Sequence, residues 1–491
     1  MKLCLLLPSY EQSGSAFKGV DPVQDPSRWL PEHDWDRHFL HKATAVRTVR
    51  QLARRGYDVF INLCDGAWDE DLAGLEVAIE LERLGLAYTG PSPQFYEPTR
   101  QNIKLLCHRI GVDTPRHAFV TGPTGAERAA SLLRFPLIVK HPNSYGSVGM
   151  SKGSRVQTRE QLLERVHAMT EQFGEALVEE FIEGPEFTVL VSEPGLGERV
   201  PRVYPPLEIR FPPGESFKHF DLKWSDYGEM TTWRVRDAAV EAGLQQLAQR
   251  IFTVMKGVGY ARLDVRADAA GRLFLLDVNP ACGVFYPPDS FGGADFILTL
   301  DPAGHRGFLE HLIACALRRQ EARRPRGRIE YGHPGGYGLV AVRELASGEL
   351  ILAGEERPHT LASLRYLERD WPEWQRAMLP RWAVPVSDEV VMAGGETPEA
   401  WSIINHSCEP NAWLEGLDCV ARRPIREGEP ITLDYATLYG AGMAEFRCEC
   451  ASPGCRGVIR ATDHLEPWVE QRYGEHLSSY VKQARARHAG Y

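Results

Sequence analysis

The sequence predicts an α/β protein over its first two thirds, followed by a mostly-β domain in its last third. Three observations support this prediction. Residues 1–95 alternate between strand-like and helix-like segments, residues 260–283 have the pattern of two adjoining strands, and residues 329–460 hold short β segments between turn residues. A chain of 491 residues has room for about three domains, each with its own core.

The composition is that of an ordinary globular protein, with 43% hydrophobic and 25% charged residues. A formal charge of −10 argues against general nucleic-acid binding, which requires a basic face. No apolar run approaches transmembrane length, and the short run before Pro8 favours a buried first strand over a signal peptide. We therefore expect a cytoplasmic protein that binds neither a membrane nor nucleic acid.

The first 95 residues predict a small parallel sheet with helices on its faces. Leu3 to Leu7 is expected to be a strand, and a polar loop to about Asp36 is long enough to serve as a lid or substrate loop. The next expected elements are a helix from Phe39 to Arg55, a strand from Tyr57 to Leu63, a helix from Leu72 to Leu84 and a short strand at Ala87–Tyr88. This β-α-β-α-β alternation is typical of parallel sheets.

The stretch from Tyr260 to Gly283 predicts a hairpin that carries a metal site. Leu263 and Val265 point to one face of its first strand, and Arg262, Asp264 and Arg266 point to the other. After a turn, the second strand ends near Asp277 and Asn279, so Asp264, Asp277 and Asn279 can converge beside Arg262. Hard oxygen ligands next to a fixed cation suit Mg²⁺ and phosphoryl transfer. Taken alone, the hairpin fits equally well a surface element with two solvated aspartates.

An anion-binding loop is predicted upstream of that hairpin. A buried strand over residues 136–140 ends in Lys140, and a glycine-containing loop follows at once. Gly146 and Gly149 let the backbone turn its N–H groups toward an anion, and Ser147 adds a hydroxyl donor. A further strand over residues 176–182 can present an adenine slot, and Glu186 follows where a carboxylate could accept ribose hydroxyls.

Residues 1 to about 318 together resemble an ATP-grasp ligase of the D-alanine–D-alanine ligase type. The matching segments, in chain order, are VKHPNSYGSVGMSK, EEFIEGPEFTV, FKHFDLKW, ARLDV and LLDVNPACG. The resemblance implies an N-terminal α/β domain (1–95) and an ATP-grasp domain (96–320) of two α+β subdomains. It also implies ATP, Mg²⁺ or Mn²⁺ as cofactors, and a homodimer, because relatives of this kind commonly dimerise.

The resemblance also implies a role for each matching residue. The residues implied to contact the nucleotide are Arg100, Lys140, Gly146, Ser147, Val148, Gly149, Glu179, Ile182 and Glu186. Among these, Glu179 and the backbone of Ile182 would read adenine, and Glu186 would hold the ribose. The residues implied at the reacting groups are Lys223 and Arg262 beside the γ-phosphoryl group, Asp264, Asp277 and Asn279 on Mg²⁺, and the N–H of Gly283 on the oxyanion.

Family chemistry activates a substrate carboxylate as an acyl phosphate, which an amine then converts to an amide. The chain departs from the D-alanine enzymes at three points. It lacks their N-terminal glutamate motif, Trp224 replaces a substrate tyrosine, and Pro287–Pro288 replaces a serine-containing loop. We therefore expect another amino acid or a small peptide as substrate.

The last third begins after residues 318–328, a charged stretch predicted to be a helix end followed by an interdomain linker; a nucleic-acid arm is the less favoured alternative. NHSCEPN at 405–411, GEPITLDY at 428–435 and a C-x-C-x4-C spacing then resemble a SET-domain methyltransferase with a post-SET zinc motif. The resemblance implies a SET domain at 329–445 with a pseudoknot near Asn405, a zinc motif at 446–460, and a tail at 461–491 without assigned chemistry.

This second resemblance implies S-adenosylmethionine and Zn²⁺ as cofactors. The residues implied to bind S-adenosylmethionine are Gly336, Tyr337, Gly338, Asn405 and His406. Tyr435 would orient an amine toward the methyl group. The four implied zinc ligands are Cys408, Cys448, Cys450 and Cys455. Four buried free cysteines, or two disulfides, are the alternatives; the other six cysteines are scattered, as in a reduced protein.

The sequence thus predicts a bifunctional enzyme. One half would join a carboxylate to an amine using ATP, and the other would N-methylate an amine, both acting on a small amino acid or peptide. The alternative is a protein-lysine methyltransferase whose ATP-grasp half recruits or senses a ligand. A non-catalytic binding module is the third reading, and the intact set of Asp264, Asp277, Asn279 and Tyr435 counts against it.

Overall fold

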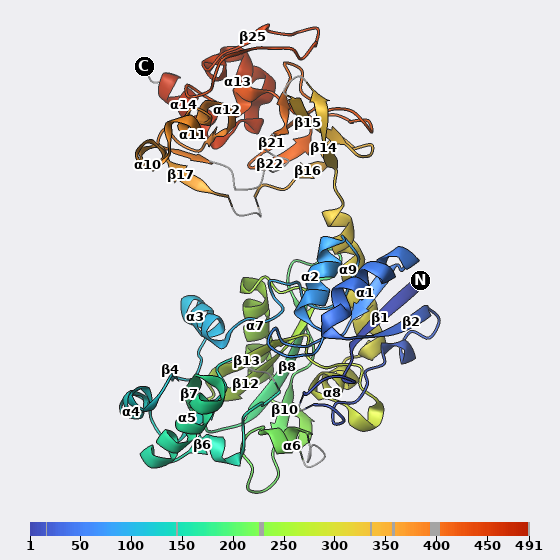
Figure 1. Ribbon diagram of the computed structural model, residues 1–491, viewed down its shortest axis with the longest axis vertical. Coiled ribbons are helices and arrows are strands. Elements are labelled where there is room, and N and C mark those ends of the chain that lie inside the picture. Colours follow the sequence, from blue (N-terminus) through green and yellow to red (C-terminus); the bar gives the residue numbers. More distant parts are fainter. Residues whose placement is uncertain are drawn as a thin grey trace. The chain divides into compact units, whose positions relative to one another are not determined.

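A computed structural model describes residues 1–15, 17–143, 146–224, 230–333, 336–355, 359–392 and 403–489, without the side chains of Lys223, Trp224 and Trp382. The chain forms two compact units, residues 1–323 and 324–491 (Figure 1). The finer division into five segments stays a prediction. Within the described ranges, no helix combines the length and apolar character needed to cross a membrane.

The N-terminal sheet of the first unit is parallel, as predicted. Its strand order is β2 (Asp34–Leu40), β1 (Lys2–Pro8), β3 (Val59–Asn62). The predicted helix at Phe39–Arg55 is wrong at its start, because Phe39 and Leu40 belong to β2 and α1 spans Ala45–Leu52. Apolar and polar residues alternate only weakly along β2. It is a strand because it pairs with β1 along the whole length of that strand. The short strand at Ala87–Tyr88 is reduced to an isolated bridge between Phe60 and Tyr88.

Helices cover both faces of this sheet (Figure 1). On one face, Cys4 and Leu6 of β1 pack with apolar residues of α1 and of α2 (Leu75–Arg83). On the other, Leu3, Leu5 and Leu7 pack with α8 (Gly293–Leu300) and α9 (Gly304–Arg323). Residues 3–7 of β1 are therefore buried on both sides of the sheet, as strands of parallel sheets usually are.

A second, antiparallel sheet contains the predicted hairpin. Its strand order is β11 (Thr231–Arg234), β10 (Leu207–Arg210), β8 (Glu186–Ser192), β12 (Tyr260–Ala267), β13 (Leu273–Pro280), with β9 (Arg202–Val203) beside β8. Helix α7 (Ala238–Val254) packs on its apolar face against Leu263, Val265 and Val278. The polar face of β12 and β13 is left to line a cavity.

A third sheet supplies the other side of that cavity. Its order is β4 (His117–Val120), β7 (Ala176–Glu180), β5 (Leu137–Lys140), β6 (Arg155–Val156). Helices α4 (Pro123–Leu132) and α5 (Arg159–Phe173) pack on one face of this sheet. Two further helices, α3 (Arg100–Ile110) and the short α6 (Phe220–Trp224), lie in the connections between the sheets.

The second unit is built from short strands, as expected for its turn-rich sequence. Its strands are β14 (Gly327–His333), β15 (Gly336–Ala341), β16 (Leu350–Leu352), β17 (Leu361–Ser363), β18 (Val384–Pro385), β19 (Val390–Met392), β20 (Asn405–His406), β21 (Ala412–Glu415), β22 (Asp418–Ala421), β23 (Thr432–Leu433), β24 (Phe446–Arg447) and β25 (Val458–Ile459). The pairs are antiparallel except β20 with β23, which run parallel. That parallel pair lies where the pseudoknot is predicted.

The α-helices that the described residues of this unit form are α10 (Leu364–Asp370), α11 (Glu373–Arg376), α12 (Leu379–Trp382), α13 (Pro467–Tyr473) and α14 (Ser479–Ala489). The last two belong to the segment predicted to be a tail. Val469, Tyr473, Tyr480 and Val481 form a buried cluster with Ala436, immediately after Tyr435. The tail is therefore part of the core that supports the predicted methyl-transfer tyrosine.

Candidate functional site

A cavity opens between the second and third sheets of the first unit. Its walls come from α3, from β5 and the loop after it, from β7, from the start of β8, and from the polar face of β12 and β13. The predicted residues among those that line it are Arg100, Lys140, Gly146, Ser147, Glu179, Ile182, Glu186, Arg262, Asp264, Asp277 and Asn279. Side chains from segments up to 179 residues apart therefore meet in one place.

The hairpin brings the three predicted metal ligands together. Asp264 lies directly opposite Asp277 across β12 and β13, and Arg262 lies opposite Asn279. The Asn279 amide donates to Asp264 Oδ2 at 3.4 Å, and Arg262 Nη2 lies 3.4 Å from the same oxygen. Two carboxylates and an amide oxygen that face one cavity are a donor set that suits Mg²⁺ or Mn²⁺. Their convergence is confirmed, and their role as ligands stays a prediction.

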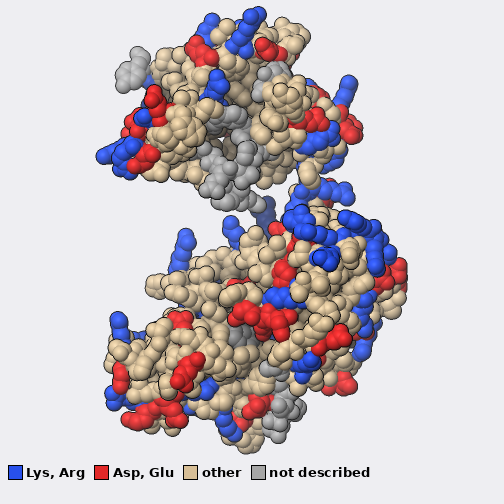
Figure 2. Space-filling view, in the orientation of Figure 1, with Lys and Arg blue, Asp and Glu red and all other residues tan. Residues whose placement is uncertain are grey.

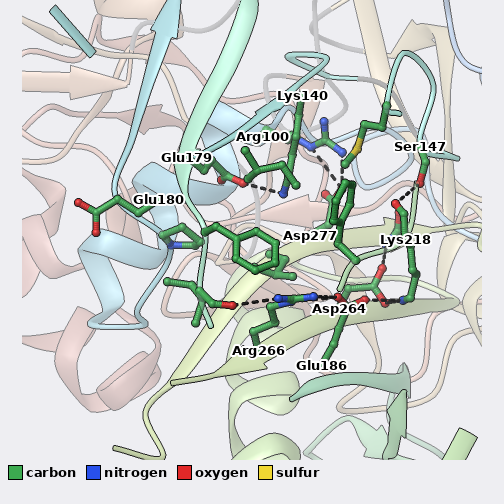
Figure 3. A pocket seen from close by; sticks show the side chains of 18 of the residues that line it. Arg100, Lys140, Ser147, Glu179, Glu180, Glu186, Lys218, Asp264, Arg266 and Asp277 are labelled. Carbon is green, nitrogen blue, oxygen red and sulfur yellow. Dashed lines mark hydrogen bonds and ion pairs between the residues drawn. The ribbon is translucent and has the colours of Figure 1, made fainter. Parts of the chain in front are cut away.

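Cationic side chains pair with Glu179, Glu186, Asp264 and Asp277 in this cavity (Figure 3). Arg100 Nη2 lies 2.7 Å from Asp277 Oδ2. Glu186, predicted to hold ribose, lies 3.0 Å from both Arg266 Nη2 and Lys218 Nζ. Burial raises the pKa of Glu186, but Lys218 and Arg266 outweigh burial and hold that pKa below its usual value. Glu186 is therefore ionised at neutral pH.

The predicted anion-binding loop has the backbone that such a loop requires. Gly146 and Gly149 have φ of 68° and 70°, and Ser147 between them has φ of 65°. The Ser147 hydroxyl donates to the carbonyl of Lys218 at 3.1 Å, which ties the loop to the segment before α6. Gly146 and Ser147 line the cavity, whereas Val148 and Gly149 continue the loop without belonging to the described lining.

Glu179 occupies the end of the cavity predicted for adenine. It is buried, and its two carboxylate oxygens are paired with Lys104 and, at 2.6 Å, with Lys140. Burial raises the pKa of Glu179, but the two lysines reverse that effect and hold the pKa well below its ordinary range. The Ile182 carbonyl accepts from Arg266 at 2.9 Å. The Ile182 N–H has no hydrogen-bond partner among the described residues and is the backbone group left for a base.

A second cavity of about 700 Å³ adjoins the first. It shares Lys218 and Arg262 with the first cavity, and Gly283 lines it. Its remaining lining includes apolar side chains such as Ile209, Phe291 and Phe296. The two cavities thus meet at a pair of cations. Of the predicted residues here, the side chain of Lys223 lies outside the described residues.

In the second unit, the predicted methyl-transfer residues are neighbours. Tyr435 donates its hydroxyl to the Ile404 carbonyl at 2.9 Å, and its N–H donates to His406 Nδ1 at 3.2 Å. Burial raises the pKa of Tyr435 to about 12, so its phenol stays protonated at neutral pH. Burial likewise lowers the pKa of His406 to about 4, which keeps that imidazole neutral. Both groups are therefore suited to positioning a substrate, not to accepting a proton from it.

The segment predicted to bind S-adenosylmethionine is joined to this tyrosine by β20. Asn405 donates its side-chain amide to the Tyr337 carbonyl at 2.8 Å. A Cβ on Gly338 would lie 3.1 Å from that amide nitrogen, so glycine permits the approach. Gly336 has φ of 90°, which also favours glycine. The structure therefore brings Gly336–Gly338 and Asn405–His406 together; cofactor binding there stays a prediction.

The four predicted zinc ligands form one cluster. The sulfur atoms of Cys408, Cys448, Cys450 and Cys455 all lie within 4.8 Å of one another, and those of Cys408 and Cys448 are 3.8 Å apart. A tetrahedral zinc with Zn–S bonds of about 2.3 Å places its ligands about 3.8 Å apart, so the cluster fits Zn²⁺. The backbone N–H of Arg456 donates to Cys408 Sγ at 3.3 Å, the kind of contact that stabilises a thiolate.

Family models match both units. The model described as D-ala D-ala ligase C-terminus matches residues 111–286, and the SET domain model matches residues 336–436. A D-alanine–D-alanine ligase of Ectopseudomonas mendocina is 34% identical over 224 residues, covering 45% of this chain and 66% of its own length. The chain therefore spans just under two thirds of that relative.

A D-alanine–D-alanine ligase of Cupriavidus pinatubonensis is 31% identical over 265 residues, covering 52% of this chain and 74% of its own length. The chain belongs to the D-alanine–D-alanine ligase family. It joins an ATP-grasp unit of this family to a SET domain, as the sequence predicted. The crystal structure of a D-alanine–D-alanine ligase from Bacillus anthracis aligns with 66% of this chain and 99% of its own chain, with 18% identity and a TM-score of 0.49.

Sequence reasoning missed several side chains of this ATP-grasp unit. Lys218 and Arg266 line the first cavity, and Lys104 is buried against Glu179. Strand alternation could have predicted Arg266 as a site residue, because Arg266 shares the polar face of β12 with Arg262 and Asp264. The sequence indicates Lys218 more weakly. It lies within the FKHFDLKW segment, but that stretch has neither strand nor helix periodicity. No feature of the sequence indicates that Lys104 is buried at the site, because a lysine on a helix normally faces solvent.

Proposed function

We propose that residues 1–323 form an ATP- and Mg²⁺-dependent carboxylate–amine ligase, and that residues 324–491 form an S-adenosylmethionine-dependent N-methyltransferase. One observation carries the ligase proposal. Asp264, Asp277 and Asn279 converge beside Arg262 in a cavity whose opposite wall holds Lys140 and the loop of Gly146 and Ser147. Oxygen ligands, fixed cations and a glycine-containing loop around one cavity are the parts that phosphoryl transfer requires.

In this proposal the two adjoining cavities hold the two reactants. ATP lies in the first, with Lys140 and the Gly146–Ser147 backbone on its phosphates, Ile182 beside the base and Glu186 beside the ribose. Mg²⁺, held by Asp264, Asp277 and Asn279, would neutralise charge on the transferred phosphoryl group. The substrate carboxylate lies in the second cavity and attacks the γ-phosphate near Arg262, giving an acyl phosphate and ADP. An amine then displaces phosphate, and the N–H of Gly283 donates to the oxyanion.

The substrates of this ligase half are amino acids or small peptides. The family match supports small amino-acid substrates, and the second cavity has the size and mixed lining for one. Its apolar wall, with Ile209, Phe291 and Phe296, supports a substrate larger or less polar than alanine. This choice agrees with the replacement of the D-alanine enzymes' serine-containing loop by Pro287–Pro288.

The methyltransferase half positions an amine next to the methyl donor. S-adenosylmethionine would supply the methyl group, held by Gly336–Gly338 and Asn405–His406. Tyr435 holds its hydroxyl on the Ile404 carbonyl, and the rings of Tyr439 and Phe446 stand 5.0 and 5.9 Å from its own ring. An apolar aromatic wall of this kind desolvates an amine, which favours its neutral, nucleophilic form. Zn²⁺ on the four cysteines would hold the segment after Tyr439 in place.

Purified protein tests both activities in one incubation with ATP, Mg²⁺, isotope-labelled S-adenosylmethionine and a pool of amino acids. Mass spectrometry would find a new amide that carries the methyl label, formed with release of phosphate. Asp277→Asn would abolish the amide, and Tyr435→Phe would abolish the label. A labelled compound without a new amide would refute sequential action on one substrate.

The alternative, a protein-lysine methyltransferase, draws support from one observation. Residues 324–491 form a compact unit with its own apolar core, as a methyltransferase that acts separately from the ligase half requires. This alternative predicts label on a protein lysine without ATP consumption. Label confined to small molecules would exclude it.

A further inference from the structure

Lys218 stands where the two cavities of the ligase unit meet. It lines both of them, as Arg262 does. Its ammonium lies 3.0 Å from Glu186 Oε1 and 3.2 Å from Asp264 Oδ1 (Figure 3). Its carbonyl accepts from the Ser147 hydroxyl, so the backbone at Lys218 is also fixed to the anion-binding loop. One residue thus contacts a predicted metal ligand, the predicted ribose ligand and the predicted phosphate loop.

The oxygens of Asp264 are already engaged in this ligand-free structure. Lys218 holds Oδ1, and Arg262 and Asn279 lie 3.4 Å from Oδ2. Asp277 is held in the same way by Arg100. A divalent cation that binds these carboxylates is therefore repelled by the cations already beside them, and moving one of those cations away relieves the repulsion. Lys218 is the one suited to move, because its flexible side chain keeps a second partner, Glu186, when it releases Asp264.

We propose that Lys218 is an exchange cation for the ligase reaction, which rests on the proposed function. Before ligands bind, it occupies Asp264 and keeps the acidic pocket neutralised. With Mg²⁺ bound at Asp264, the ammonium of Lys218 would turn from that carboxylate toward the phosphoryl group that is transferred between the two cavities. Lys218 therefore competes with the metal and supports the nucleotide, two opposite effects from one charge.

The test removes the charge and measures metal and nucleotide separately. Lys218→Met keeps the aliphatic stem, and Mn²⁺ binding to the nucleotide-free protein is followed by electron paramagnetic resonance. Without the competing ammonium, we expect Mn²⁺ to bind at least about fivefold more tightly, since a charge pair at a partly buried site is worth about 1 kcal/mol or more. ATP turnover should fall at least about tenfold. Lys218→Arg, which keeps the charge, should bind Mn²⁺ nearly as the wild type does.

Lys152→Met is the matched control. Lys152 also forms an ion pair, with Glu215, and its side chain is 68% exposed. Its removal lowers the net charge by the same amount but should change neither Mn²⁺ affinity nor ATP turnover. This control separates a local competition from the general effect of a more negative protein.

Unchanged or weaker Mn²⁺ binding by Lys218→Met, or unchanged ATP turnover, would overturn the inference. A wild-type protein that consumes no ATP would refute the proposed function instead, and the Mn²⁺ measurement would still report on Lys218. If Lys218→Met does not fold, acetylation of the wild-type protein replaces it. Mn²⁺ alone should make Lys218 react faster and Mn²⁺ with a non-hydrolysable ATP analogue should protect it, whereas a rate unaffected by metal would overturn the inference.

Discussion

The guanidinium of Arg456 binds the carboxylate of Asp434 through two parallel hydrogen bonds, Nη1 to Oδ2 and Nη2 to Oδ1, both of 2.7 Å. Asp434 is buried and precedes Tyr435, and it also accepts from the Tyr473 hydroxyl at 2.8 Å. Arg456 follows Cys455, and its N–H donates to Cys408 Sγ. The pair therefore links the cysteine cluster, helix α13 and the predicted methyl-transfer tyrosine.

Removing one partner of this pair should destabilise the second unit. Arg456→Met leaves the Asp434 carboxylate buried without its main cation, which typically costs about 3–5 kcal/mol. Arg456→Lys keeps a charge but loses the parallel geometry, so its cost should be smaller. Thermal unfolding followed by calorimetry measures both. The transition of residues 1–323 should not move, and equal stability of Arg456→Met and the wild type would contradict the proposed link.

Zinc should be required for the order of residues 446–460. Elemental analysis should find one zinc per chain, and Cys448→Ser should remove it. β24 and β25 contribute only two residue pairs to their ladder, so a bound metal is needed to hold this segment. Treatment with a strong chelator should expose the segment to proteolysis between Met443 and Gly457. A zinc-free protein with an equally resistant segment would count against a metal site.

Loss of the Tyr435 hydroxyl should reduce methyl transfer far more than stability. Tyr435→Phe removes the hydrogen bond to the Ile404 carbonyl, a net loss of about 1 kcal/mol in stability, but also removes the group predicted to orient the amine. Because burial raises the pKa of Tyr435 to about 12, the phenol does not act as a base at neutral pH. Methyl transfer should fall at least about a hundredfold. Tyr439→Phe, at the neighbouring ring, is the matched control and should keep most activity.

Asp65 should make the stability of the first unit fall with rising pH. Burial, with Asp21 and Glu70 nearby, raises its pKa from 3.8 to about 8. The folded state therefore favours the protonated acid, and this contribution is complete below pH 4 and is lost as pH rises toward 8. Asp65→Asn cannot titrate, so its stability relative to the wild type should increase from pH 4 to pH 8. Denaturant unfolding of both proteins across this range measures it, and a constant difference would show that Asp65 has an ordinary pKa.

The sequence was most informative where local periodicity places side chains. Alternation along β12 and β13 put Arg262, Asp264 and Asp277 on one face, and the structure confirms that they meet. The pairing of strands that lie far apart in the sequence could not be predicted from it. β2 is a strand because it pairs with the edge of β1. Apolar and polar residues alternate too weakly along β2 for its sequence to predict this.

Long-range contacts also explain the missed site residues. Lys218 comes from an irregular segment between β10 and α6, so no pattern gives its direction. The predicted tail packs Tyr473 and Tyr480 around Ala436, although its polar sequence suggested no such role. Cys448, Cys450 and Cys455 are close in sequence, but Cys408, which follows β20, joins them from 40 residues away. The expectation of no general nucleic-acid binding stays a prediction; Figure 2 shows both acidic and basic side chains on the drawn face of each unit.

Trapping of the activated carboxylate tests the central claim most directly. Hydroxylamine added to protein, ATP, Mg²⁺ and an amino-acid pool should convert an acyl phosphate to a hydroxamate, in proportion to the ADP formed. The account predicts hydroxamate with the wild type and a loss of at least about a hundredfold with Asp277→Asn, which removes the charge of one predicted metal ligand. ADP formation without any hydroxamate, or equal hydroxamate from both proteins, would contradict it.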